Sequence, residues 1–570
     1  MQKKSLYMLV AVVLAIIVIG SVVGYVLLTT SPPVEKILVV GTTDDEVTFD
    51  PADSYDYFSI NIIQNTMAML LTYDTGTTNL IPDLLSQVPT LANGGISSDG
   101  LNYTLHLRAN LKFENGNAIN ASVLKYSLDR VVFLNGEPAF LVGYIKGSQE
   151  YWNIGNDVAN LTRKASAWLN YTMQGVEIVD ATTVKVHLRA EWSPFTSLLA
   201  FSITAPVDPN SFRMTGFYPN LTVSSGPYRL TKYTPHQRYE FTANANYYGT
   251  PPKTAKVTMV RYTTAVDLKL AIQTGEIDVA YRSLLPQDFA TLKTNANLRT
   301  MQGDSPFIRY LVFNMCSAAD VTAGDCPRTT VFSGASGLLI RKALAYATNR
   351  TDISNSAYNG TVSNLYSLIP MGMFGHDDAF KQVYGSTVNV AAAQALLTQA
   401  GYSTSSKLPI TLWYTPSHYG DPEIFVAQTL KRSWEATGMV TVTIDQQDWA
   451  SYRTSWRAGT FDVFLLGWFP DYFDPDDYVY PFLHWASGGS ASFGNWYHNA
   501  TMDAKIEAEA ATADPTARAT LFGEIQDGLA ADVPYLPLFQ SPQTVVFKPN
   551  ISGIVLDPIQ FFRLFIISVA

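Results

Sequence analysis

The 570-residue chain has little charge and no concentration of positive charge. Charged residues make up 15% of it, and its 48 acidic residues outnumber its 38 lysines and arginines, which gives a formal net charge of -10. Proteins that bind nucleic acid need a basic patch to neutralise phosphates. Basic residues such as Lys3 and Lys4 occur side by side at most in pairs, and the sequence has no longer cluster of them. We therefore expect no nucleic-acid partner.

Sequence motifs for catalysis and metal binding are also missing. The sequence has no H-E-x-x-H, no G-x-S-x-G and no P-loop motif. Its seven histidines are scattered without a close pair, and its two cysteines do not have the spacing of a metal site. We expect a protein that is not an enzyme and that holds no cofactor and no metal. An extracellular hydrolase, a metal carrier and a surface-layer protein are the alternatives from other classes.

Only one long apolar run occurs, at residues 7–28, and it contains no charged residue. About twenty apolar residues span a bilayer as a helix. Two lysines precede the run, which places residues 1–6 in the cytoplasm and the rest of the chain outside. We predict a single-pass membrane anchor at 7–28, a short stalk at 29–35, and binding domains on the extracellular or periplasmic side. A cleaved signal peptide is the alternative, although no A-x-A site follows the run.

The two cysteines, Cys316 and Cys326, both lie beyond the predicted anchor. Outside the cytoplasm, thiols oxidise readily. Nine residues separate the two cysteines, and Gly324 lies between them, so a closed loop is feasible. We expect a disulfide between them, with two free thiols as the alternative.

Strand and helix patterns alternate along the chain and divide into two α/β units. Apolar residues with a period of two indicate strands, and a period near 3.6 indicates helices. A chain of this length exceeds what one hydrophobic core supports. Two α/β lobes imply a cleft between them, where ligands bind. The first unit has strand, helix and strand at 256–262, 265–274 and 276–280, and the second has them at 408–414, 422–437 and 440–445.

Short motifs follow one another along the chain in a specific order. Each is weak alone, but their order and spacing together are highly specific. The segments are Thr48–Ala52, Leu101–Arg108, Leu111–Gly116, Ser127–Arg130, Gly226–Arg229, Gly275–Val279, Ile340–Arg350, Leu396–Tyr402, Gly459–Val463 and Gly467–Pro475.

This series resembles the peptide/nickel-type solute-binding proteins of ABC importers (family 5, dipeptide- and oligopeptide-binding type), over almost all of the chain after the anchor. The resemblance implies an α/β, two-lobed periplasmic-binding-protein-like fold of the class II type with an extra inserted domain, here preceded by one N-terminal transmembrane helix. The implied domains are lobe I at 36–60, 223–305 and 534–570, inserted domain II at 61–222 and lobe III at 306–533, with the chain crossing between lobes near Gly303–Phe307 and Val533–Leu536.

The resemblance also implies a function. In this family the lobes close on a solute by a hinge motion, and the membrane permease recognises the closed form. We therefore expect a monomer that captures oligopeptides and delivers them to the permease subunits of an ABC transporter. Oligopeptide binders carry an arginine three residues before the tryptophan of the Gly467 motif, but this chain has Leu465. An oligosaccharide is therefore the alternative ligand.

Four residues are candidates for binding the ligand. Peptide-binding relatives use the aspartate that matches Asp471 to pair with the α-ammonium of the ligand, because a buried ammonium needs a charged partner. Trp468 and Tyr472 flank it and are expected to stack on the ligand. His418 matches a cleft-lining stretch of the family. The alternatives are structural: Asp471 capping the following turn, Trp468 in the core, and His418 as a structural histidine.

Overall fold

The computed structural model describes residues 36–150, 173–214, 216–220, 223–282, 284–416, 418–419 and 422–570. The expected membrane span at 7–28 and its flanks at 1–6 and 29–35 lie outside these residues. Within the described ranges, no helix has both the length and the apolar character that crossing a membrane requires.

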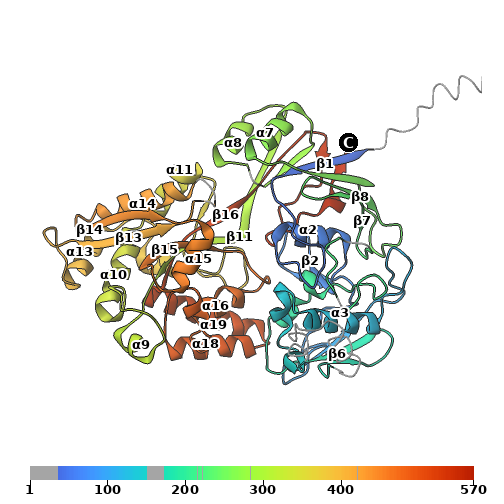
Figure 1. Ribbon diagram of the computed structural model, residues 1–570, viewed down its shortest axis with the longest axis horizontal. Coiled ribbons are helices and arrows are strands. Elements are labelled where there is room, and N and C mark those ends of the chain that lie inside the picture. The colour runs from blue at the N-terminus through green and yellow to red at the C-terminus, as the bar shows by residue number, and fades with distance from the viewer. Residues whose placement is uncertain are drawn as a thin grey trace, which may run out of the picture.

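One mixed sheet runs through both halves of the molecule and joins them (Figure 1). The described part of the chain contributes eleven strands to it. In order across the sheet they are β14 (Val440–Gln446), β13 (Leu408–Tyr414), β15 (Val463–Trp468), β11 (Arg299–Phe313), β16 (Tyr535–Phe547), β10 (Val279–Tyr281), β1 (Ile37–Thr42), β9 (Lys256–Arg261), β8 (Arg238–Ala243) and β7 (Tyr228–Thr234), with β12 (Ser363–Asn364) paired to β16.

The distal lobe, on the left of Figure 1, is built around β13, β14 and β15. These strands pair in parallel, and alternate residues of β13 are buried, as a strand with one covered face requires. Helix α14 (Glu423–Glu435) packs on β13 and β14 and places Trp434 in the core. The other helices of this lobe are α9 (Ala318–Ala323), α10 (Gly334–Ala347), α11 (Arg350–Tyr358), α12 (Ala379–Tyr384), α13 (Val390–Gln399), α15 (Trp449–Arg457), α16 (Tyr480–Leu483), α17 (Gly489–Ser492), α18 (Ala500–Ala511) and α19 (Pro515–Asp532), with the 3-10 turn η3 (Pro475–Tyr478).

The other half of the molecule has separate proximal and inserted cores. The proximal core lies around β1 and β7 to β10, with α2 (Tyr57–Thr66), α7 (Ala265–Thr274) and α8 (Pro286–Leu292). The inserted core, at the lower right of Figure 1, joins α3 (Ala121–Leu134) to an antiparallel sheet of β4 (Asn102–His106), β6 (Thr183–His187) and β5 (Val176–Ile178). Smaller elements are β2 (Leu71–Tyr73), β3 (Leu80–Pro82), α6 (Phe195–Leu198), β17 (Ile551–Ser552), β18 (Ser568–Val569) and the turns η1 (Glu137–Val142), η2 (Ser202–Thr204) and η4 (Leu564–Ile566).

Strands β11 and β16 connect the two halves. They pair antiparallel along most of their length, and the register shifts between Asp304 and Ile308. On β16, Phe539 belongs to the distal core and Val545 to the proximal core. The return crossing therefore falls between these two residues, later than the expected Val533–Leu536, because the first residues of β16 still pair with the distal part of β11.

A buried ion pair fixes the inserted domain to the proximal core. Arg130 on α3 donates two hydrogen bonds to the Asp50 carboxylate, with Nη1···Oδ1 at 2.7 Å and Nη2···Oδ2 at 2.6 Å. Asp50 also accepts hydrogen bonds from the backbone amides of Ala52 and Tyr218. Two of the motifs singled out in the sequence therefore contain the two halves of one structural contact.

The structure joins Cys316 to Cys326 in a disulfide, with their Cα atoms 6.1 Å apart. The bridge closes the loop that contains α9 and packs with Trp496 in a small cluster at the edge of the distal lobe. Both cysteines are buried, at 0% and 8% exposure.

We expect the double substitution of Cys316 and Cys326 by serine to lower the free energy of unfolding by about 3 kcal/mol, because the open loop gains conformational entropy in the unfolded chain. Urea unfolding of the oxidised wild type and of the variant measures the difference. As a control, a reducing agent should shift the wild-type curve and leave the variant unchanged. Coincident curves for the oxidised wild type and the variant would contradict the prediction.

Candidate functional site

A cleft of about 740 Å³ lies between the proximal and distal halves, beside the β11–β16 connection. The described residues that line it include two arginines, one histidine and no carboxylate. Its proximal wall includes Thr43, Tyr55, Tyr57, Arg282 and Gln560, and its distal wall includes Phe307, Arg309, His418, Tyr419 and Phe469.

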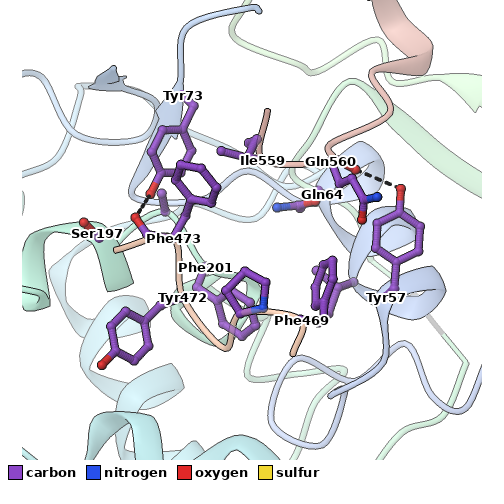
Figure 2. Close-up of a pocket in the computed structure, with 13 residues that line it drawn as sticks. Tyr57, Gln64, Tyr73, Ser197, Phe201, Phe469, Tyr472, Phe473, Ile559 and Gln560 are labelled. Carbon is purple, nitrogen blue, oxygen red and sulfur yellow. Dashed lines mark hydrogen bonds between the residues drawn. The ribbon is translucent and has the colours of Figure 1, made fainter. Parts of the chain in front are cut away.

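Two tyrosines on the segment that leads into α2 carry much of the proximal wall. Asp56 between them caps α2 by accepting a hydrogen bond from the Ser59 amide at 2.8 Å, which fixes the segment. The Tyr57 hydroxyl donates to the backbone carbonyl of Gln560 at 2.8 Å, and its ring meets Phe469 of the distal lobe edge to face beside a smaller neighbouring cavity (Figure 2). The Tyr55 hydroxyl donates a short hydrogen bond to Oδ1 of Asp471. This segment therefore contacts the distal lobe at both tyrosines.

Asp471 follows β15 and is half-buried. Burial raises its pKa to about 7, against the opposing effect of the Tyr55 hydrogen bond. Asp477 lies beside it and accepts a hydrogen bond from the Asp471 amide at 2.7 Å. Burial, followed by the charge of Asp471, raises the pKa of Asp477 well above its usual value. The two carboxyl groups therefore resist being ionised together, and a cation placed beside Asp471 would relieve the repulsion.

Other carboxylates of the same loop already have partners. Asp474 receives two hydrogen bonds from Arg518, at 2.7 and 2.8 Å, and Arg518 also bonds to Glu509 at 2.9 Å. Asp474 caps the turn η3 as well. Asp471 does not cap that turn, and among the described residues no lysine, arginine or histidine forms an ion pair with it. Asp471 is thus the carboxylate of this loop that a cationic ligand group could approach.

Trp468 and Tyr472, which were expected to stack on the ligand, do not line the main cleft. Trp468 packs its ring against Phe482 and Phe493 of the distal core, with centroids 5.3 and 5.5 Å away. Its indole N–H donates to Asp477 at 3.1 Å, so it positions the partner of Asp471. Trp468 therefore packs in the distal core and is not among the residues that line the main cleft.

Tyr472 is also placed differently from the expectation, being 8% exposed. Its ring lies edge to face with Trp192 of the inserted domain, 5.5 Å between centroids, and its hydroxyl donates to Asp476. It borders a cavity of about 50 Å³ at the junction of the domains and points away from Tyr57 (Figure 2). Tyr472 therefore joins the distal lobe to the inserted domain through its contact with Trp192. Successive residues after β15 point in different directions, so they do not all face the cleft. Phe469 is the aromatic residue of this motif that lines the main cleft.

His418 lies in the distal wall of the cleft. Its imidazole stacks on Trp449 with centroids 3.6 Å apart and ring planes within 5°. Burial and then the positive charges of Arg309 and Arg453 lower its pKa to about 4. His418 is therefore neutral at neutral pH and offers the cleft a polar but uncharged surface.

Arg309 on β11 occupies a region that the sequence analysis did not identify. Its guanidinium carbon lies 3.4 Å from the centre of the Tyr419 ring, and it pairs with Glu423 on α14. It sits opposite Gly467 in the sheet, where an added Cβ would lie 2.6 Å from Arg309 Nη1. Gly467 therefore leaves room for this arginine. Leu465, the position of the missing family arginine, is fully buried in the distal core.

Comparisons with known proteins agree with this architecture. The family model described as bacterial extracellular solute-binding proteins, family 5 Middle, matches residues 86–490. The glutathione-binding protein GsiB of Salmonella typhimurium is 24% identical over 532 residues, covering 92% of each chain. The dipeptide-binding protein of Escherichia coli is 25% identical over 527 residues, covering 90% of this chain and 89% of its own.

A solved structure supports the fold. The unliganded open form of MppA, a periplasmic murein tripeptide-binding protein, superposes with a TM-score of 0.75 at 20% identity, covering 94% of this chain and 98% of its own. The two-lobed α/β periplasmic-binding-protein-like fold expected from the sequence is thus confirmed. The family model covers well over half of the chain, so the protein belongs to family 5 of the bacterial extracellular solute-binding proteins.

Proposed function

We propose that this protein is the extracytoplasmic solute-binding component of an ABC importer and that it captures oligopeptides in the interlobe cleft. Family membership supports the class of function, and the relatives named for glutathione, dipeptides and murein tripeptide all bind peptide-like solutes. Delivery to the permease follows from the two-lobed design, because a closed cleft presents a different outer surface from an open one. We also propose that residues 7–28 anchor the protein to the membrane, and that the lobes have the boundaries expected from the sequence except at the return crossing, which falls between Phe539 and Val545.

The observation that carries the peptide proposal is the state of Asp471. A half-buried carboxyl group with a pKa raised to about 7 lies beside Asp477, and no cation pairs with it among the described residues. An α-ammonium is a compact cation with three donors, and a buried carboxylate is its natural partner. A neutral sugar would leave this charge uncompensated, so the site favours a peptide over an oligosaccharide.

Thermal unfolding of the full-length protein in mild detergent tests the proposal. Di- to hexapeptides with a free amino terminus should raise the unfolding temperature saturably, because a ligand present at a hundred times its Kd adds about 2.7 kcal/mol to the stability of the folded state. The same peptides acetylated at the amino terminus serve as matched controls and should shift it much less. A shift with malto-oligosaccharides and none with peptides would contradict the proposal.

A further inference from the structure

The cleft contains more positive charge than a site for an ammonium group needs. Its described lining includes Arg282, Arg309 and His418. His418 is neutral at neutral pH, as described above. Arg309 is 1% exposed, lies under Tyr419 and already pairs with Glu423. Arg282, whose side chain is 27% exposed, is thus the charged group that a ligand in the cleft can approach.

The backbone conformation of Arg282 and the contacts of its side chain fix the orientation of its guanidinium group. It directly follows β10 and has φ 58°, in the left-handed region that residues other than glycine seldom adopt. Its guanidinium carbon lies 3.9 Å from the centre of the Tyr57 ring, and this stacking fixes the plane of the guanidinium group, whose N–H donors form a fork. The Asp44 carboxylate lies 3.6 Å from Nη1, and Nη1 is buried and makes no hydrogen bond. The fork is therefore oriented but incompletely satisfied.

The same short segment holds Arg282 and Asp471. Tyr55 contacts Asp471 through its hydroxyl, and Tyr57 contacts Arg282 through its ring. Asp56 between them has extended backbone angles, and in an extended segment the side chains at i and i+2 point to the same side. Two such residues are separated by about 7 Å along the chain. Asp471 and Arg282 therefore contact neighbouring side chains of one segment, so one short ligand lying along it can meet both charged groups.

We propose that Arg282, oriented by Tyr57, binds the terminal carboxylate of a short zwitterionic peptide whose ammonium group meets Asp471. This inference rests on the proposed function and adds to it one residue that determines specificity, Arg282. A planar, permanently charged guanidinium fork matches a carboxylate and can donate two parallel hydrogen bonds to it. The arrangement also accounts for the absence of an arginine at Leu465, because the carboxylate is met from the opposite wall of the cleft.

Calorimetric titration of the full-length protein tests this with alanine di-, tri- and hexapeptides, each as the free acid and as the carboxyl-terminal amide. The wild type should bind the best free acid at least about tenfold more tightly than its amide, the factor expected for one charge-assisted hydrogen-bonding contact. R282Q should lose that preference while keeping the wild-type affinity for the amide, which also shows that the variant is folded. R282K should recover part of the preference, since it restores the charge without the fork.

The controls separate this inference from the function on which it rests. R238Q, at an exposed arginine on β8 of the same lobe, should bind both peptide forms as the wild type does. If the wild type binds peptides and R282Q keeps the full preference for free acids, the role of Arg282 is refuted and the proposed function stands. If the wild type binds no peptide in either form, both are refuted.

Discussion

Replacing Arg130 with methionine is expected to lower the free energy of unfolding by about 3 to 5 kcal/mol, the usual cost of removing one partner from a buried ion pair. The side chains of Arg130 and Asp50 are 1% and 0% exposed. Without the guanidinium, the Asp50 carboxylate loses two short hydrogen bonds and remains buried as an uncompensated charge. The carbonyl groups of Arg213 and Gly216 also lose their donor. The methionine fills much of the volume, so the loss reports mainly on charge and hydrogen bonding.

Lys125→Met provides the matched control on the same helix. Lys125 pairs with Asp129 at 3.3 Å, but its side chain is 19% exposed, and an i,i+4 pair near the surface contributes about 0.3–0.5 kcal/mol. Urea unfolding followed by circular dichroism, with tryptophan fluorescence as a second probe, measures both variants and detects separate unfolding of the domains. If R130M and K125M have the same free energy of unfolding, the Asp50–Arg130 pair does not join the inserted domain to the proximal core as its geometry indicates.

The Asp50–Arg130 pair also marks the limit of prediction from sequence. Both residues lie in motifs that the sequence analysis identified, but eighty positions separate them and no local pattern indicates that they meet. Elements that depend on local periodicity were predicted well: the expected helix at 422–437 contains α14, and the expected strand at 440–445 is β14 with one more residue. The single sheet through both lobes was not predicted, because the pairing of β11 with β16 depends on contacts between segments more than two hundred residues apart.

Some features of the candidate site could likewise be predicted from the sequence, and others could not. Asp471 was identified from its motif, and the structure places it three residues after β15, behind Tyr55 of the cleft wall, which donates a hydrogen bond to it. The orientations of Trp468 and Tyr472 could not be predicted, because they depend on the Phe482 cluster and on Trp192 of another domain. No local sequence pattern indicates that Arg282, Tyr55 and Tyr57 of the proximal wall take part in binding. A tyrosine pair at i and i+2 ahead of a capped helix is a common sequence, and only the fold brings it to the cleft.

Peptide binding is expected to weaken as the pH falls below about 7, because the ammonium group needs an ionised Asp471. Each pH unit below the pKa of the empty site reduces the ionised fraction about tenfold, which corresponds to 1.36 kcal/mol per unit. With a pKa of about 7, the ionised fraction falls from about one half at pH 7 to about 1% at pH 5, so the Kd should rise about 50-fold between these pH values. Burial raises the pKa of Asp471, and the Tyr55 hydrogen bond opposes the rise. Asp477 is the titratable neighbour, and the charge of Asp471 helps to raise the pKa of Asp477.

The stability of the ligand-free protein should change in the opposite direction. Because the folded-state pKa of Asp471 is raised above its unfolded value, the folded state binds more protons between about pH 4 and pH 7, and this group makes unfolding harder as the pH falls through that window. Asp471→Asn imitates the protonated form. It should weaken peptide binding about 10- to 100-fold at pH 8, remove most of the pH dependence of Kd, and leave the empty protein at least as stable as the wild type.

Calorimetric titration of the wild type and D471N at pH 5, 6, 7 and 8, with unfolding curves at each pH, measures all three effects. The acetylated peptide is the control ligand, because it lacks the ammonium group and its affinity should not depend on Asp471. A wild-type Kd that stays constant from pH 8 to pH 5, or that rises equally in D471N, would show that another group binds the amino terminus. A loss of binding together with a loss of stability in D471N would assign Asp471 a structural role, since a site built for a cation should become more stable, not less, when its charge is removed.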